Sequence, residues 1–303
     1  MNGILPLWKE RGMTSHDCVF KLRKILKTKK VGHTGTLDPG VEGVLPICIG
    51  QATRIAEYLT DAGKTYEAVV SIGRTTTTED AEGETVEENN AFKSFTRDEI
   101  LQALTSLTGE IEQTPPMFSA VKVNGKKLYE YARAGQTVER PTRKITIYEL
   151  ELLDDAETFE GEEVTFSIRI KCSKGTYIRT LAVQIGEALG YPAHMHELVR
   201  TASGTFTKEN CFTLAQIAEM MEAGEKEKFL LPVEYALSNY PYVEITPDIE
   251  KQIFNGQVLP MHALLKEHDK MVYGVDGRAF AVYIAHPTKI GQMKPDKMFP
   301  ELD

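Results

Sequence analysis

The spacing of apolar residues predicts an amphipathic helix near the N-terminus. Between Ser15 and Leu26, apolar side chains recur every three to four residues, and basic residues fill the positions between them. Thr14 or Ser15 would cap this helix, because a side-chain oxygen there accepts a bond from the first turn. The helix is therefore expected to have one apolar and one cationic side.

Other stretches of the chain show further helical and strand patterns. Helical spacing recurs at Ala52–Thr60, at Arg97–Leu107 and at Thr180–Leu189, where Gly190 would end the helix. Strands are predicted at Val44–Ile49, Thr65–Ile72 and Val164–Cys172. Strands and helices alternate without a regular βαβ repeat. The pattern favours an α+β domain whose mixed, mostly antiparallel sheet is flanked by helices.

The C-terminal part of the chain has the pattern of a small β-rich module. A proline-bearing connection over Leu231–Pro241 indicates a boundary. Short strand-like runs follow at Tyr242–Ile245, Met271–Val275 and Ala279–Ile284, with Asp276-Gly277 as a hairpin turn between the last two. We therefore expect one large domain over residues 1–235 and a second domain over residues 240–303.

Length and composition agree with a globular protein of this organisation. The 303 residues are 42% hydrophobic, which is enough for a sizeable core. The N-terminal apolar stretch is interrupted by Pro6 and followed by charged residues, so we expect neither an export signal nor a membrane span. The four cysteines lie far apart in sequence, as is typical of reduced thiols in a cytoplasmic protein.

Charge is distributed unevenly along the chain. The net charge of -9 speaks at first against a nucleic-acid partner. Basic residues nevertheless concentrate in Lys21–Lys30 and Lys122–Lys144, whereas acidic residues concentrate in Glu79–Glu88 and Glu149–Glu163. Two interpretations of the basic runs stay open. They are either solvated helix faces or part of a polarised surface with one face able to bind a polyanion.

The most unusual segment of the sequence runs from Gly32 to Gly43. Its four glycines indicate sharp turns or backbone pressed against a ligand. Pro39 restricts Asp38 to an extended conformation, so this carboxylate is expected on a stiff loop just before a buried strand. A carboxylate held in this way suits covalent catalysis. Asp-Pro-Gly is also a common turn, and local chemistry alone leaves the structural interpretation open.

This segment strongly resembles the catalytic loop of the TruB family of tRNA pseudouridine synthases. Three other segments match the family in the same order: Lys64-Thr65-Tyr66, Lys174-Gly175-Thr176-Tyr177-Ile178-Arg179-Thr180, and Leu198–Phe206. The resemblance covers the chain from Gly3 to Phe206, and the C-terminal module resembles the PUA-type RNA-binding domain more weakly. Together, these resemblances imply a pseudouridine synthase fold followed by a PUA-like domain.

The sequence also departs from the family pattern at several positions. Trp8 and Glu10 flank Lys9 where the family commonly has aspartate and proline. Gly40-Val41-Glu42 replaces a more frequent Leu-Ala-Thr, and Val199 stands where arginine is usual. None of these positions is the catalytic aspartate, so they affect loop packing and RNA contacts and leave the implied reaction class unchanged.

The resemblance implies isomerisation of uridine to pseudouridine at position 55 in the T-arm of transfer RNA. It assigns Asp38 as the catalytic carboxylate, Arg179 as its cationic partner and Tyr66 as the residue against the flipped base, by stacking or by proton transfer. Substrate binding would fall to His33, Lys64, Tyr177, Leu198 and Lys122. The target base must leave its stack to be reached. The basic loop Thr114–Arg143 would clamp the RNA and order on binding it.

The sequence carries no motif that indicates a cofactor or a metal ion. There is no dinucleotide fingerprint and no phosphate-binding lysine loop, and His194 and His196 have no nearby cysteine in sequence. We expect a cofactor-free monomer of the stand-alone bacterial type that acts on tRNA away from membranes. Two alternatives remain: a non-catalytic RNA-binding protein or RNA chaperone, and an aspartate-nucleophile hydrolase, which a missing metal-binding aspartate pair disfavours.

Overall fold

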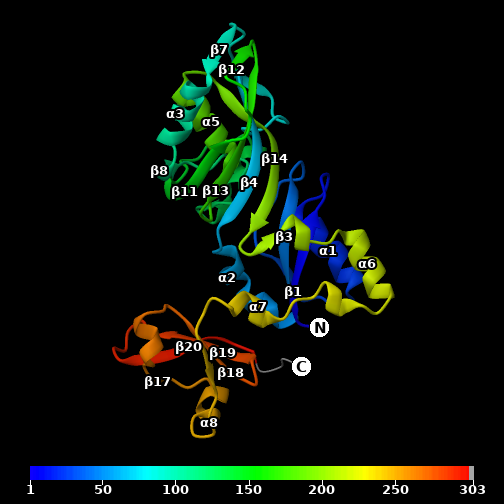
Figure 1. The fold of residues 1–303 in the computed structure, drawn as a ribbon, viewed down its shortest axis with the longest axis vertical. Coiled ribbons are helices and arrows are strands. Elements are labelled where there is room, and N and C mark those ends of the chain that lie inside the picture. Colours follow the sequence, from blue (N-terminus) through cyan, green and yellow to red (C-terminus); the bar gives the residue numbers. More distant parts are fainter. Residues whose placement is uncertain (300–303) are drawn as a thin grey trace. The chain divides into compact units, whose positions relative to one another are not determined.

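A computed structural model describes residues 1–299 of the chain (Figure 1). These residues form two compact units. The first combines Met1–Pro39 and Val44–Thr60 with the chain from Glu209 onward. The second consists of Gly40–Gly43 and Asp61–Lys208. The glycine-rich segment thus contributes to both units.

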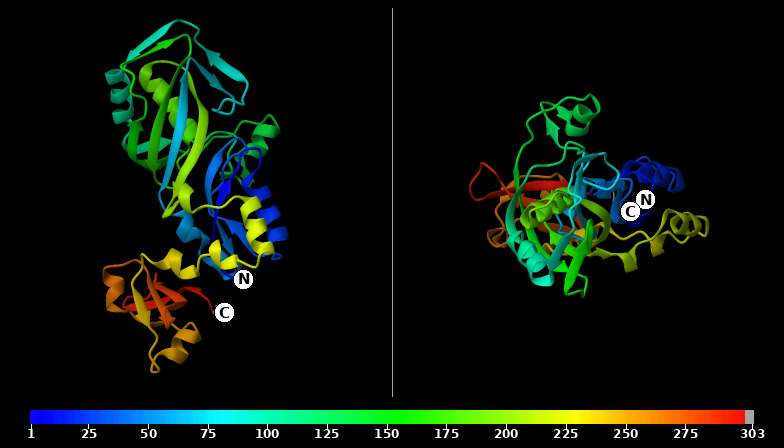
Figure 2. Two further views of the ribbon diagram at one scale, coloured as in Figure 1. Left: turned by 45° about the vertical axis from the view of Figure 1, so that its right-hand side comes forward. Right: turned by 90° about the horizontal axis from the view of Figure 1, so that it is seen from above.

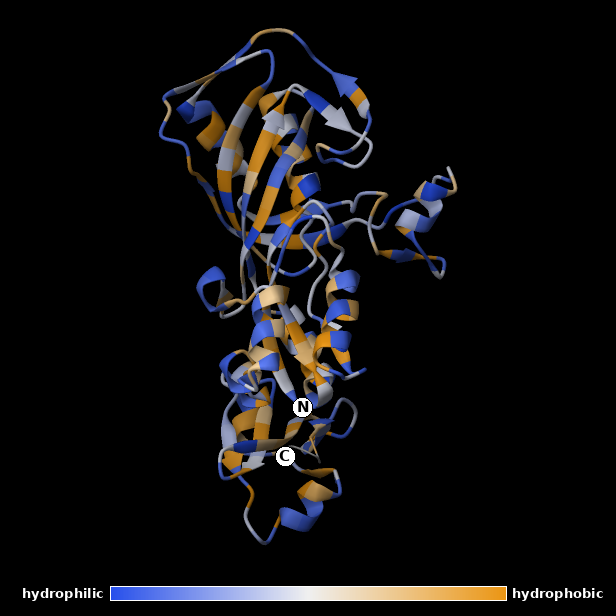
Figure 3. Cartoon of the chain, turned by 90° about the vertical axis from the view of Figure 1, so that its right-hand side faces the viewer, coloured by the Kyte–Doolittle hydropathy of each residue, from blue (hydrophilic) through white to orange (hydrophobic). Residues whose placement is uncertain are grey.

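The second unit is built on a long antiparallel sheet. Its strands lie in the order β14 (Ala193–Ser203), β4 (Lys64–Ile72), β13 (Val164–Cys172), β11 (Arg143–Leu152) and β8 (Gly109–Gln113). Glu42 and Gly43 add a short parallel pairing with Val199 and Arg200 of β14. Figure 3 shows hydrophobic and hydrophilic residues alternating along these strands, the period that places one face against a core. The predicted mixed, mostly antiparallel sheet is confirmed.

Helices α5 (Ile178–Leu189) and α3 (Arg97–Ser106) cover this sheet (Figure 1). Helix α5 packs against β14 and β4, and α3 packs against α5 and β11. Gly190 follows the last residue of α5, as predicted, and its φ of 81° is the left-handed conformation that glycine favours at a helix end. Helix α3 begins with a capping box between Thr96 and Glu99.

The basic segment between β8 and β11 contains secondary structure that was not predicted from its sequence. It contains a hairpin of β9 (Lys122–Val123) and β10 (Lys126–Lys127), followed by helix α4 (Leu128–Arg133). Buried Leu128 and the backbone bond from its N–H to Val121 O anchor the helix. Figure 2 shows this segment extending away from the sheet of its own unit.

Several short strands complete the second unit. They are β5 (Arg74–Thr76) with β6 (Thr85–Glu88), β7 (Lys93–Thr96) with β12 (Thr158–Gly161), and β15 (Phe206–Thr207) beside β14.

The N-terminal part of the first unit has three strands and the predicted basic helix. β3 (Glu42–Ile49) pairs with β1 (Gly3–Lys9) and β2 (Val31–His33). Helix α1 (Ser15–Ile25) is capped by Thr14 in a capping box with Asp17, so Thr14 is the cap and Ser15 is the first helical residue. Val19 and Leu22 on its apolar side are buried, as predicted.

One predicted helix is divided in the structure. Residues 52–60 were expected to form one helix, but a 3-10 helix, η1 (Gly50–Ile55), precedes a short α2 (Ala56–Thr60). The Thr53 hydroxyl donates to Gly50 O at 2.8 Å, which satisfies a carbonyl within the tighter turn. Gly50 itself has a φ of 61°, so the chain turns sharply as it leaves β3.

The C-terminal part of the first unit carries the predicted β-rich module. After α6 (Leu214–Glu222) and α7 (Val233–Leu237), a sheet has the order β16 (Tyr242–Glu244), β18 (Met271–Val275), β19 (Arg278–Ala285), β20 (Gln292–Met298) and β17 (Leu259–Pro260), with α8 (Glu250–Phe254) beside it. Asp276 and Gly277 have φ values of 50° and 78°, which confirms the hairpin turn.

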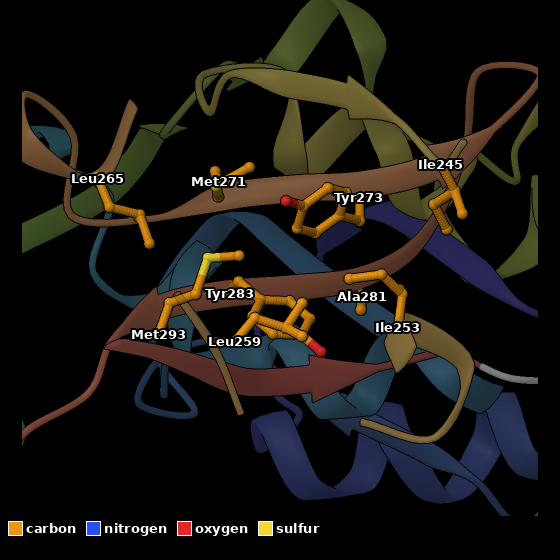
Figure 4. Close-up of a cluster of buried hydrophobic side chains, with 9 residues drawn as sticks. All are labelled: Ile245, Ile253, Leu259, Leu265, Met271, Tyr273, Ala281, Tyr283 and Met293. Atoms are coloured by element: carbon orange, nitrogen blue, oxygen red, sulfur yellow. The ribbon is translucent and has the colours of Figure 1, made fainter. Parts of the chain in front are cut away.

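A compact apolar core holds this C-terminal sheet together. Figure 4 shows it: Ile245, Ile253, Leu259, Leu265, Met271, Tyr273, Ala281, Tyr283 and Met293. The rings of Tyr273 and Tyr283 pack edge to face, with their centroids 5.4 Å apart. The Tyr283 hydroxyl donates to Gln257 O, so its polar end is satisfied inside the core.

Among the helices of residues 1–299, none is long and apolar enough to cross a membrane.

Candidate active site

Asp38 lies in the irregular segment that joins β2 to β3. It is half-buried, and the residues on either side differ: Leu37 is buried, whereas Pro39 is exposed. Thr34 anchors the start of the segment, because its N–H and its hydroxyl both donate to Pro46 O at 3.1 Å. The hydroxyl of Thr60, at the end of α2, donates to Thr34 O at 2.9 Å. The carboxylate is therefore carried by an anchored loop, as the sequence predicted.

Arg179 lies in the first turn of α5 and is buried, with 7% of its surface exposed. Its guanidinium donates to Thr78 O at 3.0 Å and to Phe118 O at 2.9 Å. Asp80 lies 3.8 Å away and supplies a negative charge. Two backbone carbonyls thus fix the plane of the guanidinium, which is a rigid fork suited to a carboxylate or a phosphate.

A turn rich in acidic residues supports the start of α5. Asp80 is itself held by the Thr78 hydroxyl at 2.5 Å and by the Glu82 N–H at 3.1 Å. Glu79 accepts a bond from the Thr180 hydroxyl at 2.7 Å. Burial raises the pKa of Glu79, and the Thr180 bond and the charge of Arg179 oppose that shift. Carboxylates at a helix N-terminus also complement the helix dipole.

Tyr66 and Leu198 lie on one face of the sheet, on neighbouring strands. Tyr66 of β4 is directly opposite Arg200 of β14, and Leu198 is opposite Ala68. Because side chains alternate along a strand, residues 64, 66 and 68 share a face of β4 with residues 198 and 200 of β14. Tyr66, Leu198 and Arg200 are all buried. This face combines an aromatic ring, an apolar side chain and a cation.

Lys64 adds a second cation to the same face. It is buried, with 8% of its surface exposed, and its ammonium donates to Ala62 O at 3.1 Å. Burial, and then the charge of Arg200, lower the pKa of Lys64 to about 8. An anion placed near Lys64 would favour its charged form and so oppose both effects.

Tyr177 immediately precedes α5 and is held through its backbone. Its N–H donates to Gln113 Oε1 at 3.0 Å, and its carbonyl accepts from Gln113 Nε2 at 3.2 Å. Gln113 is buried at the end of β8, and its amide also donates to Gln184 Oε1 at 3.1 Å. The Gln113 side chain therefore fixes both the N–H and the carbonyl of Tyr177, two residues before Arg179.

Comparisons with known proteins supply the family. A profile for the N terminal domain of TruB family pseudouridylate synthases matches residues 23–178, and a tRNA pseudouridylate synthase B C-terminal domain profile matches residues 179–238. Proteins named tRNA pseudouridine synthase B from Geobacillus thermodenitrificans and Listeria innocua are each 56% identical to the chain. Those matches cover 99% and 98% of this chain and 100% and 98% of the relatives. The chain belongs to the TruB family of pseudouridine synthases.

Solved structures with the same fold extend beyond these relatives. A chain in the crystal structure of a Cbf5-Nop10-Gar1 complex is 31% identical, with a TM-score of 0.71 over 98% of this chain and 84% of that chain. A chain in an H/ACA RNP bound to a substrate RNA containing 2'-deoxyuridine is 27% identical, with a TM-score of 0.70 and the same coverage. The α+β fold predicted for the TruB-family chain is confirmed.

The predicted site residues of this TruB-family chain are distributed over both units. Asp38 and His33 belong to the first unit, where half-buried His33 ends β2. In the second unit, Lys64, Tyr66 and Leu198 share a sheet face, and Tyr177 and Arg179 lie together at the start of α5. Lys122 is exposed on the β9–β10 hairpin.

Four residues that the sequence analysis did not assign to the site contribute to this arrangement: Asp80, Gln113, Arg200 and Ser15, whose hydroxyl accepts a bond from Leu37 N–H at 2.8 Å. Arg200 is fully buried and stood only as part of a motif, although its two-residue spacing from Leu198 placed both on one face of a strand. Asp80 lay inside the acidic run Glu79–Glu88, which the sequence analysis used only as a sign of uneven charge distribution. Ser15 and Gln113 act through backbone groups distant in sequence, for which a single sequence gives no signal.

Proposed function

We propose that this chain isomerises the uridine at position 55 in the T-arm of transfer RNA to pseudouridine, with Asp38 as the catalytic carboxylate. Membership of the TruB family supports the reaction class. The observation that carries the assignment of Asp38 is its position: a half-buried carboxylate on an anchored loop, immediately after buried Leu37 and before buried Val41. A rigid scaffold of this kind suits a catalytic group.

The reaction breaks the bond from C1′ to N1, turns the uracil while it stays bound and joins C1′ to C5. The proton on C5 is released and N1 gains one, so no electrons pass to a second molecule. Asp38 serves this reaction by attack on the sugar or the base, or by removing a proton on the way to a glycal. In each route it must be ionised when the substrate arrives.

Arg179 is proposed as the cationic partner of the catalytic carboxylate. A guanidinium beside a carboxylate favours the anionic form. The carbonyls of Thr78 and Phe118 support this role because they hold the guanidinium in one orientation. A bidentate contact would then also aim the carboxylate.

The sheet face of Tyr66 and Leu198 is proposed to bind the flipped uracil. An aromatic ring and an apolar side chain suit the two faces of a pyrimidine, and Tyr177 would complete the pocket. Tyr66 stacks on the base in this account, and proton transfer by its phenol is the bolder alternative. Lys64 would bind a phosphate, and His33 would help to hold the nucleotide out of its stack.

Two basic surfaces are proposed to bind the RNA backbone. On α1 and the following turn, Lys21, Lys24 and Lys27 are exposed, and Phe20 is 53% exposed with the Lys24 ammonium 4.5 Å above its ring. The second surface is the segment 114–143, whose exposed hairpin carries Lys122. Cations there would release counterions from phosphates, which supplies affinity without sequence preference. We propose that the second surface is mobile in the free protein and orders on RNA.

The C-terminal sheet is proposed to be a PUA-like RNA-binding domain over residues 240–303, after a catalytic domain over residues 1–235. Residues 300–303 of that range lie outside the described part of the chain. The full protein is proposed to act as a cytoplasmic monomer without a cofactor.

The test of the proposed function is release of tritium from C5-labelled uridine in a T-arm hairpin. Turnover is expected with the native hairpin, and none when cytidine replaces uridine at position 55 while labelled uridines remain elsewhere. Equal release from both hairpins would contradict the proposed target. Binding of the native hairpin without any release would instead favour the non-catalytic RNA-binding alternative.

A further inference from the structure

The hydroxyl of Ser15 holds both backbone groups of Leu37, the residue before Asp38. Ser15 Oγ accepts a bond from Leu37 N–H at 2.8 Å and donates to Leu37 O at 3.2 Å. Ser15 is 2% exposed and Leu37 is 4% exposed, so these bonds lie away from water. A single buried hydroxyl therefore satisfies the N–H and the carbonyl that set the direction of the chain into Asp38.

Helix α1 does not need this hydroxyl. Ser15 is the first helical residue, and the side chain that caps the helix belongs to Thr14, which accepts from Asp17 N–H at 3.0 Å. The Asp17 carboxylate in turn accepts from Thr14 N–H at 2.9 Å. The helix start is thus satisfied by its own capping box, and the contacts of Ser15 serve the loop.

The residue after Asp38 is held from the same N-terminal segment. Pro39 O accepts from Gly12 N–H at 2.9 Å and lies 3.4 Å from the ammonium of buried Lys9. Gly12 has a φ of 87°, which allows the chain to turn its N–H toward the loop. Asp38 is therefore flanked by two residues whose backbone groups are bonded to residues 9–15.

We propose that Ser15 is a positioning residue for the catalytic carboxylate of Asp38. The proposal rests on the proposed function, because it requires Asp38 to act on the substrate. Without the hydroxyl, Leu37 N–H and O lose their buried partner and the loop shifts to regain one. A small displacement of a reacting group lowers the rate of the chemical step more than it lowers substrate affinity.

The experiment measures single-turnover rates and RNA affinity for Ser15→Ala, Ser15→Thr and Thr14→Ala with a T-arm hairpin, well below each variant's Tm. For Ser15→Ala we expect the rate of the chemical step to fall about 10- to 100-fold, with the Kd for RNA within about twofold. Ser15→Thr keeps the hydroxyl and is expected to restore most of the rate. Thr14→Ala destabilises α1 without touching the loop, so its rate should stay near that of the unmodified protein.

Several results would overturn the proposal. A near-normal rate for Ser15→Ala would show that the hydroxyl does not position the carboxylate. Equal losses in Ser15→Ala and Thr14→Ala would attribute the effect to the helix, and a loss confined to Kd would attribute it to RNA binding. Asp38→Asn, measured in parallel, separates this proposal from the proposed function: activity of that variant contradicts the role of Asp38 itself.

Discussion

At the residue scale, the most informative groups are the buried cations Lys64 and Arg200. Both are buried on the sheet face of Tyr66, and burying a charged group carries a cost in solvation. The lowered pKa of Lys64, about 8, records that cost. A phosphate bound there would reverse the shift, because an anion favours the ammonium form. This gives a direct test of Lys64 as a substrate-binding residue.

RNA binding at pH 8.5 is expected to take up protons through Lys64. Above its pKa of about 8 the free protein holds this lysine mostly neutral, and a bound phosphate would protonate it. Calorimetry in two buffers with different ionisation enthalpies measures the uptake. It should disappear in Lys64→Met and persist in Lys226→Met, because Lys226 is exposed and is not among the charges that act on Lys64. Equal uptake in all three proteins would exclude Lys64 as the source.

The same pKa has a consequence for stability. The unfolded chain binds a proton at Lys64 up to about pH 10.5, whereas the folded chain releases it above about pH 8. Between these values the unfolded state holds more protons, so this group makes the free energy of unfolding rise with pH. Lys64→Met should flatten that rise, measured by urea unfolding at pH 8 and pH 9.5. An unchanged slope would contradict the lowered pKa.

Gly43 is required for the approach of β3 to β14. A Cβ at this position would lie 2.3 Å from Arg200 O and 2.6 Å from Arg200 N, and its φ is 138°. Gly43→Ala is therefore expected to lower the stability of the fold more than Gly109→Ala does. Gly109 has a φ of 103°, but no atom lies near the position of an added Cβ. Backbone strain alone costs about 1–3 kcal/mol. Thermal unfolding measures the Tm of both variants. Equal decreases in Tm would mean that the backbone of Arg200 shifts to make room for the added Cβ.

Residues of the site differ in how far the sequence could predict them. Asp38, Tyr66 and Arg179 stood in recognisable motifs, and the glycines around Asp38 indicated constrained backbone. The burial of Arg179 could not be predicted, because its partners are the carbonyls of Thr78 and Phe118, which are far from it in sequence. Carbonyl groups are present at every residue and carry no pattern.

At the scale of elements, Gln113 joins β8 to the start of α5. Its amide bonds both backbone groups of Tyr177, and Gln113→Leu would leave them without a buried partner. We expect a loss of about 1–3 kcal/mol in the free energy of unfolding, together with lower activity because Arg179 is two residues further on. Gln184→Ala removes the third bond of Gln113 and an exposed bond to Glu112 O, and it leaves both backbone groups of Tyr177 bonded, so it should cost less. If urea unfolding shows equal losses of stability for Gln113→Leu and Gln184→Ala, the bonds to Tyr177 are not the ones that matter.

The C-terminal sheet is joined to η1 and α2 by side chains. The Arg54 guanidinium donates to Met298 O at 2.6 Å, and Glu57 pairs with Lys297 at 2.7 Å. The Tyr58 hydroxyl donates to Asp296, and Lys270 lies 5.1 Å above the Tyr58 ring. Burial, and then the bond to Asp296, raise the pKa of Tyr58, so its phenol stays protonated and remains a donor.

Tyr58→Phe is expected to loosen this junction. The variant keeps the ring and loses the bond to a carboxylate, a contribution of about 1.5–3 kcal/mol. Hydrogen exchange should become faster in β20 while β4 and β13 keep their protection. Tyr148→Phe is the control, because Tyr148 is 57% exposed. Unchanged exchange in β20 would show that the junction does not depend on this bond.

Strong periodicity predicted elements well, and tertiary contacts explain the exceptions. Val164–Cys172 was predicted with the bounds of β13, and α1 and α3 ended within one residue of their predicted ends. The strand β14 and the helix α4 were not predicted. In β14 the alternation is broken by two register shifts, and α4 depends on packing of Leu128 rather than on a long amphipathic pattern.

At the scale of the whole molecule, charge distribution matters more than net charge. The chain carries -9, yet residues 20–30 contain six basic and no acidic residues. If this surface binds phosphates, replacing Lys24 and Lys27 by glutamine should lower the slope of log K against log salt by about 0.7–0.9 per lost contact. Replacement of exposed Lys226 and Lys228 is the control. An unchanged slope in the first variant would leave α1 as a solvated face.

The central claim is that Asp38 carries out the isomerisation, and one comparison tests it most directly. Wild type and Asp38→Asn are compared for tritium release from C5-labelled uridine in the T-arm hairpin and for binding of the same RNA. We expect release only from the wild type, with a Kd within about threefold for both, because the substitution removes one charge and keeps the shape of the side chain. Release by Asp38→Asn at a near-normal rate would contradict the account.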